Sequence, residues 1–127
     1  MTQPSPQFVD NSTVLKNPAK YEIIQVDVSK VIKSWKESLF SFEWLTPDGD
    51  IRKPEQLSDS ERQKYETVLK AYKNQQELER PILGIGIMDN VEIGSRRDVL
   101  LTLSAQNIKK LEVHINKNDK SEFNAYL

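Results

Sequence analysis

Residues 81–115 read PILGIGIMDNVEIGSRRDVLLTLSAQNIKKLEVHI, and this stretch determines most of the expected fold. The apolar run at 82–88 predicts a buried strand, and its two glycines indicate that another backbone or a ligand comes close. The Asp-Asn pair at 89–90 predicts a tight turn. The short strand VEI at 91–93 then returns, and Gly94 is expected to end it.

The second half of the stretch predicts a helix followed by a strand. Ser95 and Asp98 have the S-x-x-D spacing that marks a helix start. Apolar residues then recur at helical spacing, at Val99, Leu100 and Leu103. KLEVHI at 110–115 alternates, so one face of the strand is apolar and the other carries Glu112 and His114.

The clearest helix expected elsewhere covers residues 58–79. Ser58 and Glu61 form a capping box, in which each side chain bonds the other's backbone N–H. An apolar stripe follows at i, i+3, i+4 and i+7, made by Tyr65, Val68, Leu69 and Tyr72. Pro81 marks the end, because the residue before a proline is disfavoured in the α region.

The first half of the chain is less regular. YEIIQVDV at 21–28 alternates and predicts a strand. A short helix at 30–36 and a strand at 38–45 are expected next. TPDGD at 46–50 predicts a turn in which Gly49 is free to take a positive φ. The whole order of elements predicts a small α+β domain with a mixed sheet.

The totals exclude several classes of protein. The 127 residues fit one domain, and 18 Lys and Arg against 19 Asp and Glu exclude a globally basic nucleic-acid binder. The absence of cysteine removes disulfides, thiol nucleophiles and thiolate metal sites. The chain has no apolar run of membrane-spanning length and no signal-peptide pattern at its start, so a cytoplasmic protein without membrane contact is expected.

Three parts of the chain are expected. Residues 1–20 are polar and contain prolines, which predicts a flexible N-terminal arm that is dispensable for folding. Residues 21–116 form the domain. Residues 117–127 form a C-terminal tail with three candidates for docking, Phe123, Tyr126 and Leu127.

The candidate binding residues of the sequence are Gly94, Ser95, Arg96 and Arg97. The N-terminus of a helix carries partial positive charge, so two arginines there either point into water or share a bound anion. Phosphate suits such a place, because free helix N–H groups and guanidinium forks converge on it. The alternative is structural: Ser95 caps the helix, and Asp98 completes the cap and pairs with an arginine.

Residues 81–115 resemble the core of the ParB/sulfiredoxin-like domain, whose members have a Pro-Ile strand, a tight turn, a short strand ending in Gly and an Arg-bearing helix start. The resemblance implies that Gly94, Arg96 and Arg97 line a triphosphate site, since this motif holds CTP in ParB proteins and ATP in sulfiredoxins. Ser95 stands where ParB proteins have glutamate and sulfiredoxins have cysteine, so sulfiredoxin chemistry is excluded.

The expected function is therefore binding of a phosphate-bearing ligand, a nucleoside triphosphate with Mg²⁺, with phosphoryl transfer or hydrolysis as the reaction class if the chain is catalytic. The general base is unknown; Glu92 and Asp98 are nearest in sequence. The alternative is a non-catalytic protein-interaction module with a decayed phosphate site. The departure at Ser95 and the lack of a second ParB nucleotide motif favour it. Nucleic-acid binding by this chain is not expected, since no reading helix is recognisable.

Three further groups have a simpler interpretation than a site. His114 has no second histidine to work with, and is expected to be a surface or half-buried structural residue. Asp48, Asp50 and Glu43 lack calcium-loop spacing, so a solvated turn and no metal site is expected. The aromatic cluster of Trp35, Phe40, Phe42 and Trp44 is expected in the core. A base-stacking platform beside Lys33, Lys36, Arg52 and Lys53 is the alternative.

Overall fold

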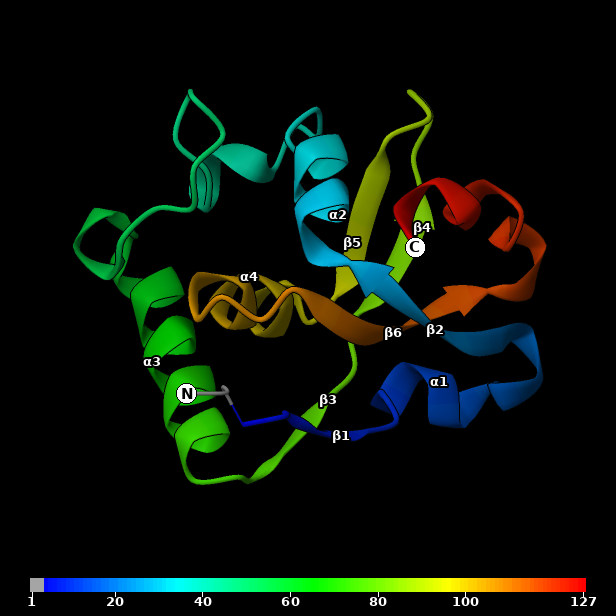
Figure 1. The fold of residues 1–127 in the computed structure, drawn as a ribbon, viewed down its shortest axis with the longest axis horizontal. Coiled ribbons are helices and arrows are strands. Elements are labelled where there is room, and N and C mark those ends of the chain that lie inside the picture. Colours follow the sequence, from blue (N-terminus) through cyan, green and yellow to red (C-terminus); the bar gives the residue numbers. More distant parts are fainter. Residues whose placement is uncertain (1–3) are drawn as a thin grey trace.

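The computed structural model describes residues 4–127 and shows an α+β fold, as the sequence predicts (Figure 1). The longer elements are, in chain order, β1 (Gln7–Val9), α1 (Ser12–Lys16), β2 (Tyr21–Asp27), α2 (Val28–Trp35), α3 (Asp59–Lys73), β3 (Glu77–Glu79), β4 (Ile82–Ile85), β5 (Val91–Ser95), α4 (Arg97–Ala105) and β6 (Lys110–Asn116). Short 3-10 helices cover Pro18–Lys20, Ser41–Glu43, Pro54–Gln56, Lys117–Asp119 and Glu122–Tyr126.

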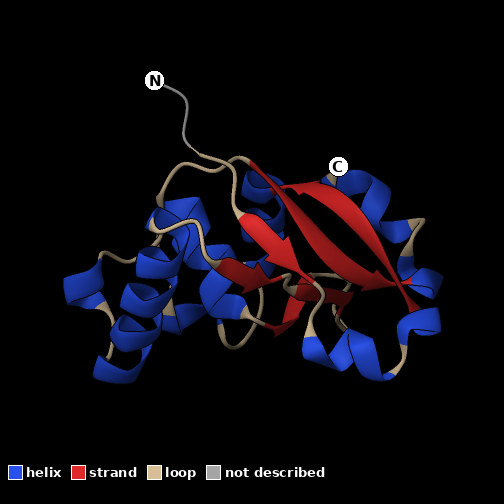
Figure 2. Cartoon of the chain, turned by 90° about the horizontal axis from the view of Figure 1, so that it is seen from below, coloured by secondary structure: helices blue, strands red, loops and turns tan. Residues whose placement is uncertain are grey.

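The main sheet is mixed and has the strand order β2-β6-β4-β5. β6 is antiparallel to β2 and parallel to β4, and β4 forms an antiparallel hairpin with β5. α4 connects β5 to β6, so its first residues follow directly from the edge strand. A second, parallel sheet pairs β1 with β3. Figure 2 shows the strands between two groups of helical segments.

The core fills the space between the main sheet and helices α2, α3 and α4. The predicted apolar faces are buried: Leu111, Val113 and Ile115 of β6 are at most 1% exposed, and Tyr65, Val68 and Tyr72 of α3 at most 8%. Trp35 and Trp44 are both fully buried, so the interpretation of the two tryptophans as core is confirmed. No helix in residues 4–127 is both long and apolar enough to cross a bilayer.

The predicted strand at 38–45 is wrong. The chain instead forms bends and a 3-10 turn there, and Leu45 makes only an isolated bridge with Ile51. The Ser41 hydroxyl donates to the carbonyls of Lys36 and Ser38, and such local bonds compete with an extended ladder. As a result Phe40 and Phe42 are exposed although Trp44 is buried, so the prediction that these two phenylalanines lie in the core is wrong.

The predicted helix at 58–79 is right at its start and wrong at its end. The Glu61 N–H donates to the Ser58 hydroxyl at 3.3 Å, which confirms that half of the capping box. The Glu61 carboxylate instead pairs with Lys64 at 3.5 Å. The helix ends at Lys73, Gln75 takes φ 55°, and the chain enters β3, whose strand partner is β1.

Residues 4–20 are not a flexible arm, and residues 1–3 of that prediction lie outside the described residues. Asn11 is 1% exposed, and its side chain donates to the Arg80 carbonyl and the Ser95 hydroxyl, both at 3.0 Å. Its backbone N–H donates to His114 Nε2 at 3.2 Å. The segment before β2 is therefore fastened to the sheet. In the C-terminal tail, Phe123 is buried as a docking residue, 1% exposed.

The predicted strand at 82–88 is shorter than expected. β4 ends at Ile85, and the hairpin turn leaves Ile87 and Met88 exposed. The turn closes through Asp89, whose φ is 60° and whose N–H donates to the Gly86 carbonyl. The apolar composition of this segment therefore does not mark burial throughout.

Candidate functional site

The start of α4 is built differently from the sequence prediction. Gly94 lies inside β5 and does not take a positive φ, so it does not break the strand. The sharp turn falls on Arg96, whose φ of 57° and ψ of 45° are left-handed. Ser95 does not cap the helix, because its hydroxyl accepts from the Asn11 side chain. Asp98 Oδ1 accepts from the Val99 N–H at 2.9 Å.

Arg96 is held by carboxylates of the protein itself. Its Nε and Nη2 donate to the two oxygens of Asp98 at 3.1 and 3.2 Å, and its Nη1 donates to Glu79 at 3.0 Å. Burial opposes the charge on Arg96, but Asp98 and Glu79 outweigh burial and raise the pKa of the guanidinium. The predicted structural alternative, in which Asp98 pairs with an arginine, is confirmed for Arg96.

Glu79 connects this cluster to the N-terminal segment. The Ser12 N–H donates to Glu79 Oε1 at 2.6 Å. This backbone bond, together with Arg96, lowers the pKa of the Glu79 carboxyl below its usual value, against the effect of burial. The turn at Arg96 therefore depends on residues from β3 and from the start of α1.

Arg97 is held mainly by aromatic rings. Its guanidinium carbon lies 5.4 Å from the ring centroid of Trp35 and 5.6 Å from that of Phe40. Its nearest carboxylate is Glu43, at 3.7 Å, which is longer than a charged hydrogen bond. Its Nε is buried without a hydrogen-bond partner among the described residues. Arg97 therefore retains donor capacity, whereas the donors of Arg96 are engaged by carboxylates.

A pocket of about 350 Å³ opens at the start of α4. All four predicted site residues line it, and the complete lining is Glu61, Lys64, Ile93, Gly94, Ser95, Arg96, Arg97 and Asp98. Its volume is at the lower end of the range for small-ligand pockets, which suits a phosphate or pyrophosphate group. The two residues that the sequence could not connect to the motif, Glu61 and Lys64, come from α3.

Neither candidate for the general base is free to take a proton from a ligand in this pocket. Glu92 does not line it, and its carboxylate accepts from the Ser38 hydroxyl at 2.7 Å and from the Asn90 amide at 2.9 Å. Asp98 lines the pocket but is bound to Arg96. The geometry therefore provides groups for binding and assigns no residue to proton transfer.

The sequence predicts that His114 lies at the surface or is half-buried. The residue is instead buried, at 1% exposed. Burial is the main cause that lowers the pKa of its imidazole. The charge of Arg80 also lowers this pKa, whereas the charges of Asp10 and Glu112 raise it. Because Nε2 accepts from the Asn11 N–H, the ring is neutral and its proton is on Nδ1. The residue fastens the N-terminal segment to β6.

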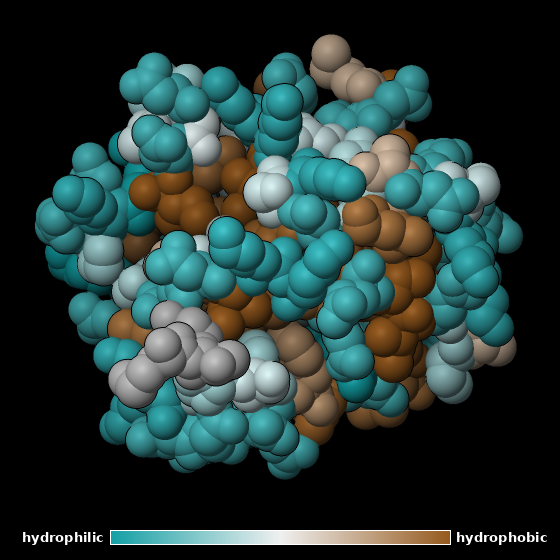
Figure 3. Space-filling model, viewed as in Figure 1, coloured by the Kyte–Doolittle hydropathy of each residue, from teal (hydrophilic) through white to brown (hydrophobic). Residues whose placement is uncertain are grey.

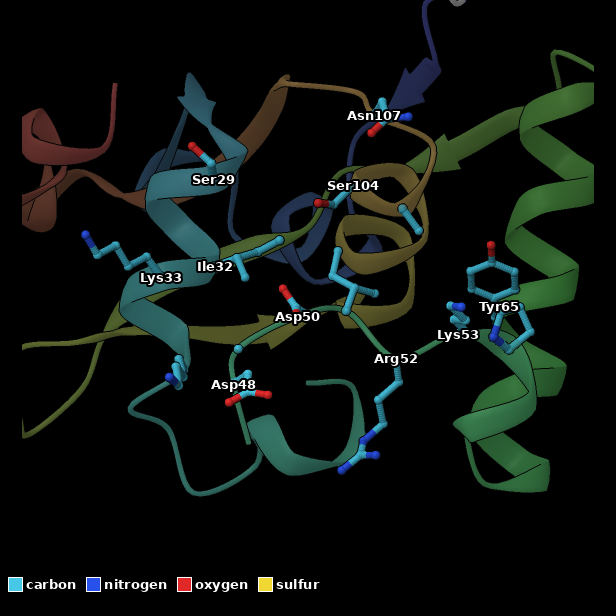
Figure 4. A pocket seen from close by; sticks show the side chains of 15 residues that line it. Ser29, Ile32, Lys33, Asp48, Asp50, Arg52, Lys53, Tyr65, Ser104 and Asn107 are labelled. Carbon is cyan, nitrogen blue, oxygen red and sulfur yellow. The ribbon is translucent and has the colours of Figure 1, made fainter. Parts of the chain in front are cut away.

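A larger pocket, of about 760 Å³, lies between α2, residues 48–54, Tyr65 of α3 and the C-terminal end of α4 (Figure 4). The sequence gives only a weak indication of this pocket. Four of its basic lining residues are close in sequence to the aromatic cluster: Lys33, Lys36, Arg52 and Lys53. Asp48 and Asp50 line this pocket too, and both are exposed, as the predicted solvated turn requires.

Neither family models, curated proteins nor solved structures give a match to this chain. The resemblance of residues 81–115 to the ParB/sulfiredoxin-like domain therefore stays a prediction. The geometry at the start of α4 is the basis on which a function can be proposed.

Proposed function

We propose that the chain binds a phosphate-bearing ligand, a nucleotide in the simplest case, at the start of α4. The observation that carries this proposal is Arg97: a guanidinium at a helix N-terminus that lines a 350 Å³ pocket, and whose nearest carboxylate in residues 4–127, Glu43, is 3.7 Å away. Its side chain is 28% exposed, so its outer nitrogens can donate to a phosphate oxygen.

The two arginines have different parts in this proposal. Arg97 and the first N–H groups of α4 contact the phosphate, since both present donors at the same end of the helix. Arg96 is a positioning residue, because its ion pairs with Asp98 and Glu79 hold the left-handed turn from which α4 starts. The expected clamp of two arginines is thus replaced by one contacting arginine and one structural arginine.

The Mg²⁺ expected with a triphosphate is not matched by the side chains around the pocket. Its carboxylates, Glu61 and Asp98, face Lys64 and Arg96. Residues 4–127 contain no group of three or more metal-ligating side chains placed to hold an ion. We therefore assign no chemical step to a metal, and the proposal concerns binding alone.

The alternative function, a protein-interaction module on the same fold, is favoured by a different observation. Large apolar side chains are exposed in two loops: Leu39, Phe40 and Phe42 are 86%, 54% and 66% exposed, and Ile87 and Met88 are 103% and 75% exposed. Exposed apolar side chains that gather in one area mark contact surfaces. Here the ion pairs around Arg96 and Arg97 would serve stability only.

Calorimetric titration with CTP, ATP and pyrophosphate, each with magnesium, tests the phosphate proposal. The wild-type chain should bind at least one of them, and Arg97→Ala should lose that binding while keeping its fold. Arg62→Ala is the matched control, because Arg62 carries the same charge, pairs with Asp59 on the surface of α3 and lines neither pocket. No heat from the wild-type chain at millimolar ligand would favour the interaction module instead.

A further inference from the structure

We propose a second binding site in the 760 Å³ pocket, for a small amphipathic organic anion: a carboxylate, sulfonate or phosphate attached to an apolar body. This goes beyond the function proposed above, because the two pockets lie at opposite ends of α4. One is lined by Arg97 and Asp98, and the other by Ser104 and Ala105. Nine helical residues separate these ends by about 13 Å.

The basic side chains of this pocket have no acidic partner. Lys33, Lys36, Arg52 and Lys53 line it, and within the described chain no carboxylate oxygen lies within 4.0 Å of any of them. Arg96 and Arg97, in contrast, both have carboxylates within that distance. The four basic side chains at this larger pocket therefore have no ion-pair partner within the described residues.

Two of these cations are held in place by their surroundings. Arg52 Nε donates to the Phe42 carbonyl at 2.9 Å, which fixes its guanidinium at the rim. Lys36 lies across Gly49, so close that a Cβ at residue 49 would be 3.1 Å from Lys36 Cδ. Gly49 also has a φ of 90°, which favours glycine, and a side chain at this position would crowd Lys36. Such fixed positions reduce the entropy cost of binding an anion.

The lining of the pocket is divided between polar and apolar surface. Ile32, Ile51, Pro54 and Ala105 line it together with Tyr65. The Tyr65 ring is fixed, because its hydroxyl accepts from Gln106 at 3.0 Å and its face is 6.4 Å from the Trp44 ring, centroid to centroid. Figure 3 shows apolar surface framed by hydrophilic residues between the positions of α2 and α3. The volume falls within the range of pockets that hold small organic ligands.

Asp48 and Asp50 narrow the class of ligand. Their charges only partly offset the four basic residues, so the lining keeps a net positive charge. In Figure 4 the Asp50 carboxylate lies between Lys33 on one side and Arg52 and Lys53 on the other. An inorganic anion would contact only the charged groups, with Asp50 close to them, whereas a larger anion can contact the lysines, offer a hydroxyl or amine to Asp50 and bury an apolar part against Ile32 and Ile51. An amphipathic anion is therefore favoured over inorganic phosphate.

Fluorescence titration with anilinonaphthalene sulfonate, an aromatic anion, tests the proposal. The triple variant Lys33→Gln/Lys36→Gln/Lys53→Gln should bind it about tenfold more weakly. Ala105→Trp, which places a bulky ring at the pocket and changes no charge, should weaken binding; Ala105 is exposed, so the fold tolerates the change. Inorganic phosphate should not compete.

Two controls distinguish binding in this pocket from a general effect of charge and from binding at the start of α4. Lys16→Gln/Lys73→Gln/Lys117→Gln changes the net charge equally at exposed positions outside the pocket and should bind like the wild-type chain. Arg97→Ala should also bind normally, so the two proposals fail independently. Equal weakening in both triple variants would overturn the proposal. So would wild-type binding by Ala105→Trp, which would place the dye on the exposed 39–42 loop.

A spectroscopic readout does not depend on the variants. In the nitrogen-labelled wild-type chain, the same sulfonate should shift the amide signals of residues 48–53 and 104–107. Signals of Gly94 and Arg97 should stay unchanged. Shifts elsewhere only, or no shift at millimolar dye, would refute the site.

Discussion

Replacing Arg96 by alanine should destabilise the protein by about 2 kcal/mol. The side chain makes three charged contacts of 3.0–3.2 Å, to Asp98 and Glu79, and is 32% exposed. Fully buried charged hydrogen bonds contribute about 1.5–3 kcal/mol each, whereas exposed ion pairs contribute about 0–1 kcal/mol. A partly exposed set lies between these limits, at roughly 0.7 kcal/mol per contact.

Arg96→Gly serves as the matched variant, because it removes the same contacts and relieves the left-handed backbone. A non-glycine residue in this conformation costs about 1 kcal/mol, so the glycine variant should be about that much more stable than the alanine variant. Urea unfolding followed by circular dichroism measures both differences. For a chain of this size, the alanine change corresponds to a fall in Tm of about 8 °C.

Two outcomes would refute this reasoning. Wild-type stability of Arg96→Ala would mean that the ion pairs with Asp98 and Glu79 contribute nothing, and that Arg96 is as free for a ligand as Arg97. A glycine variant less stable than the alanine variant would mean that the left-handed turn is not formed in solution.

Three further predictions concern the core and the N-terminal segment. Val68→Asp should unfold the domain, because it places an unpaired charge in a site 1% exposed, and melting of this variant like the wild-type chain would contradict the packing of α3. Asn11→Ala should lower the free energy of unfolding by about 2 kcal/mol through lost buried hydrogen bonds, whereas the exposed control Asn124→Ala should change it little in urea titrations. The pKa of His114 is lower in the folded chain than in the unfolded chain, so the unfolded chain binds a proton more readily. The free energy of unfolding should therefore be full above about pH 6.5 and fall as the pH drops below it. Tm measured from pH 7.5 to 5 should show this fall in the wild-type chain and a smaller one in His114→Gln, and equal slopes would exclude the histidine as the cause.

Elements with clear periodicity are predictable from the sequence. β6 alternates and α3 carries an apolar stripe, and both bury the faces that these patterns indicate. The N-terminal segment is not predictable, because it is held by contacts with residues far away in the sequence, such as those of Asn11 and the pairing of β1 with β3, and not by a local apolar pattern. The prediction for residues 38–45 is wrong because the serines there bond the local backbone and prevent an extended strand.

The candidate site is predictable only where its residues are neighbours in the sequence. Gly94–Asp98 line one pocket, as the motif indicates. The partners that decide the arginines' roles come from distant positions, Glu79 for Arg96 and the rings of Trp35 and Phe40 for Arg97. No local pattern reveals such contacts. The sequence predicts that the strand ends at Gly94, whereas the chain turns at Arg96, whose side chain is held by two carboxylates.

The most direct test of the central claim is a nuclear magnetic resonance titration of the labelled chain with CTP and magnesium. We predict saturable shifts of the amide signals of Gly94, Ser95, Arg97 and Lys64, which line the pocket at the start of α4, and loss of these shifts in Arg97→Ala. Unchanged signals at these residues at millimolar CTP would contradict the claim that this helix start binds a phosphate-bearing ligand.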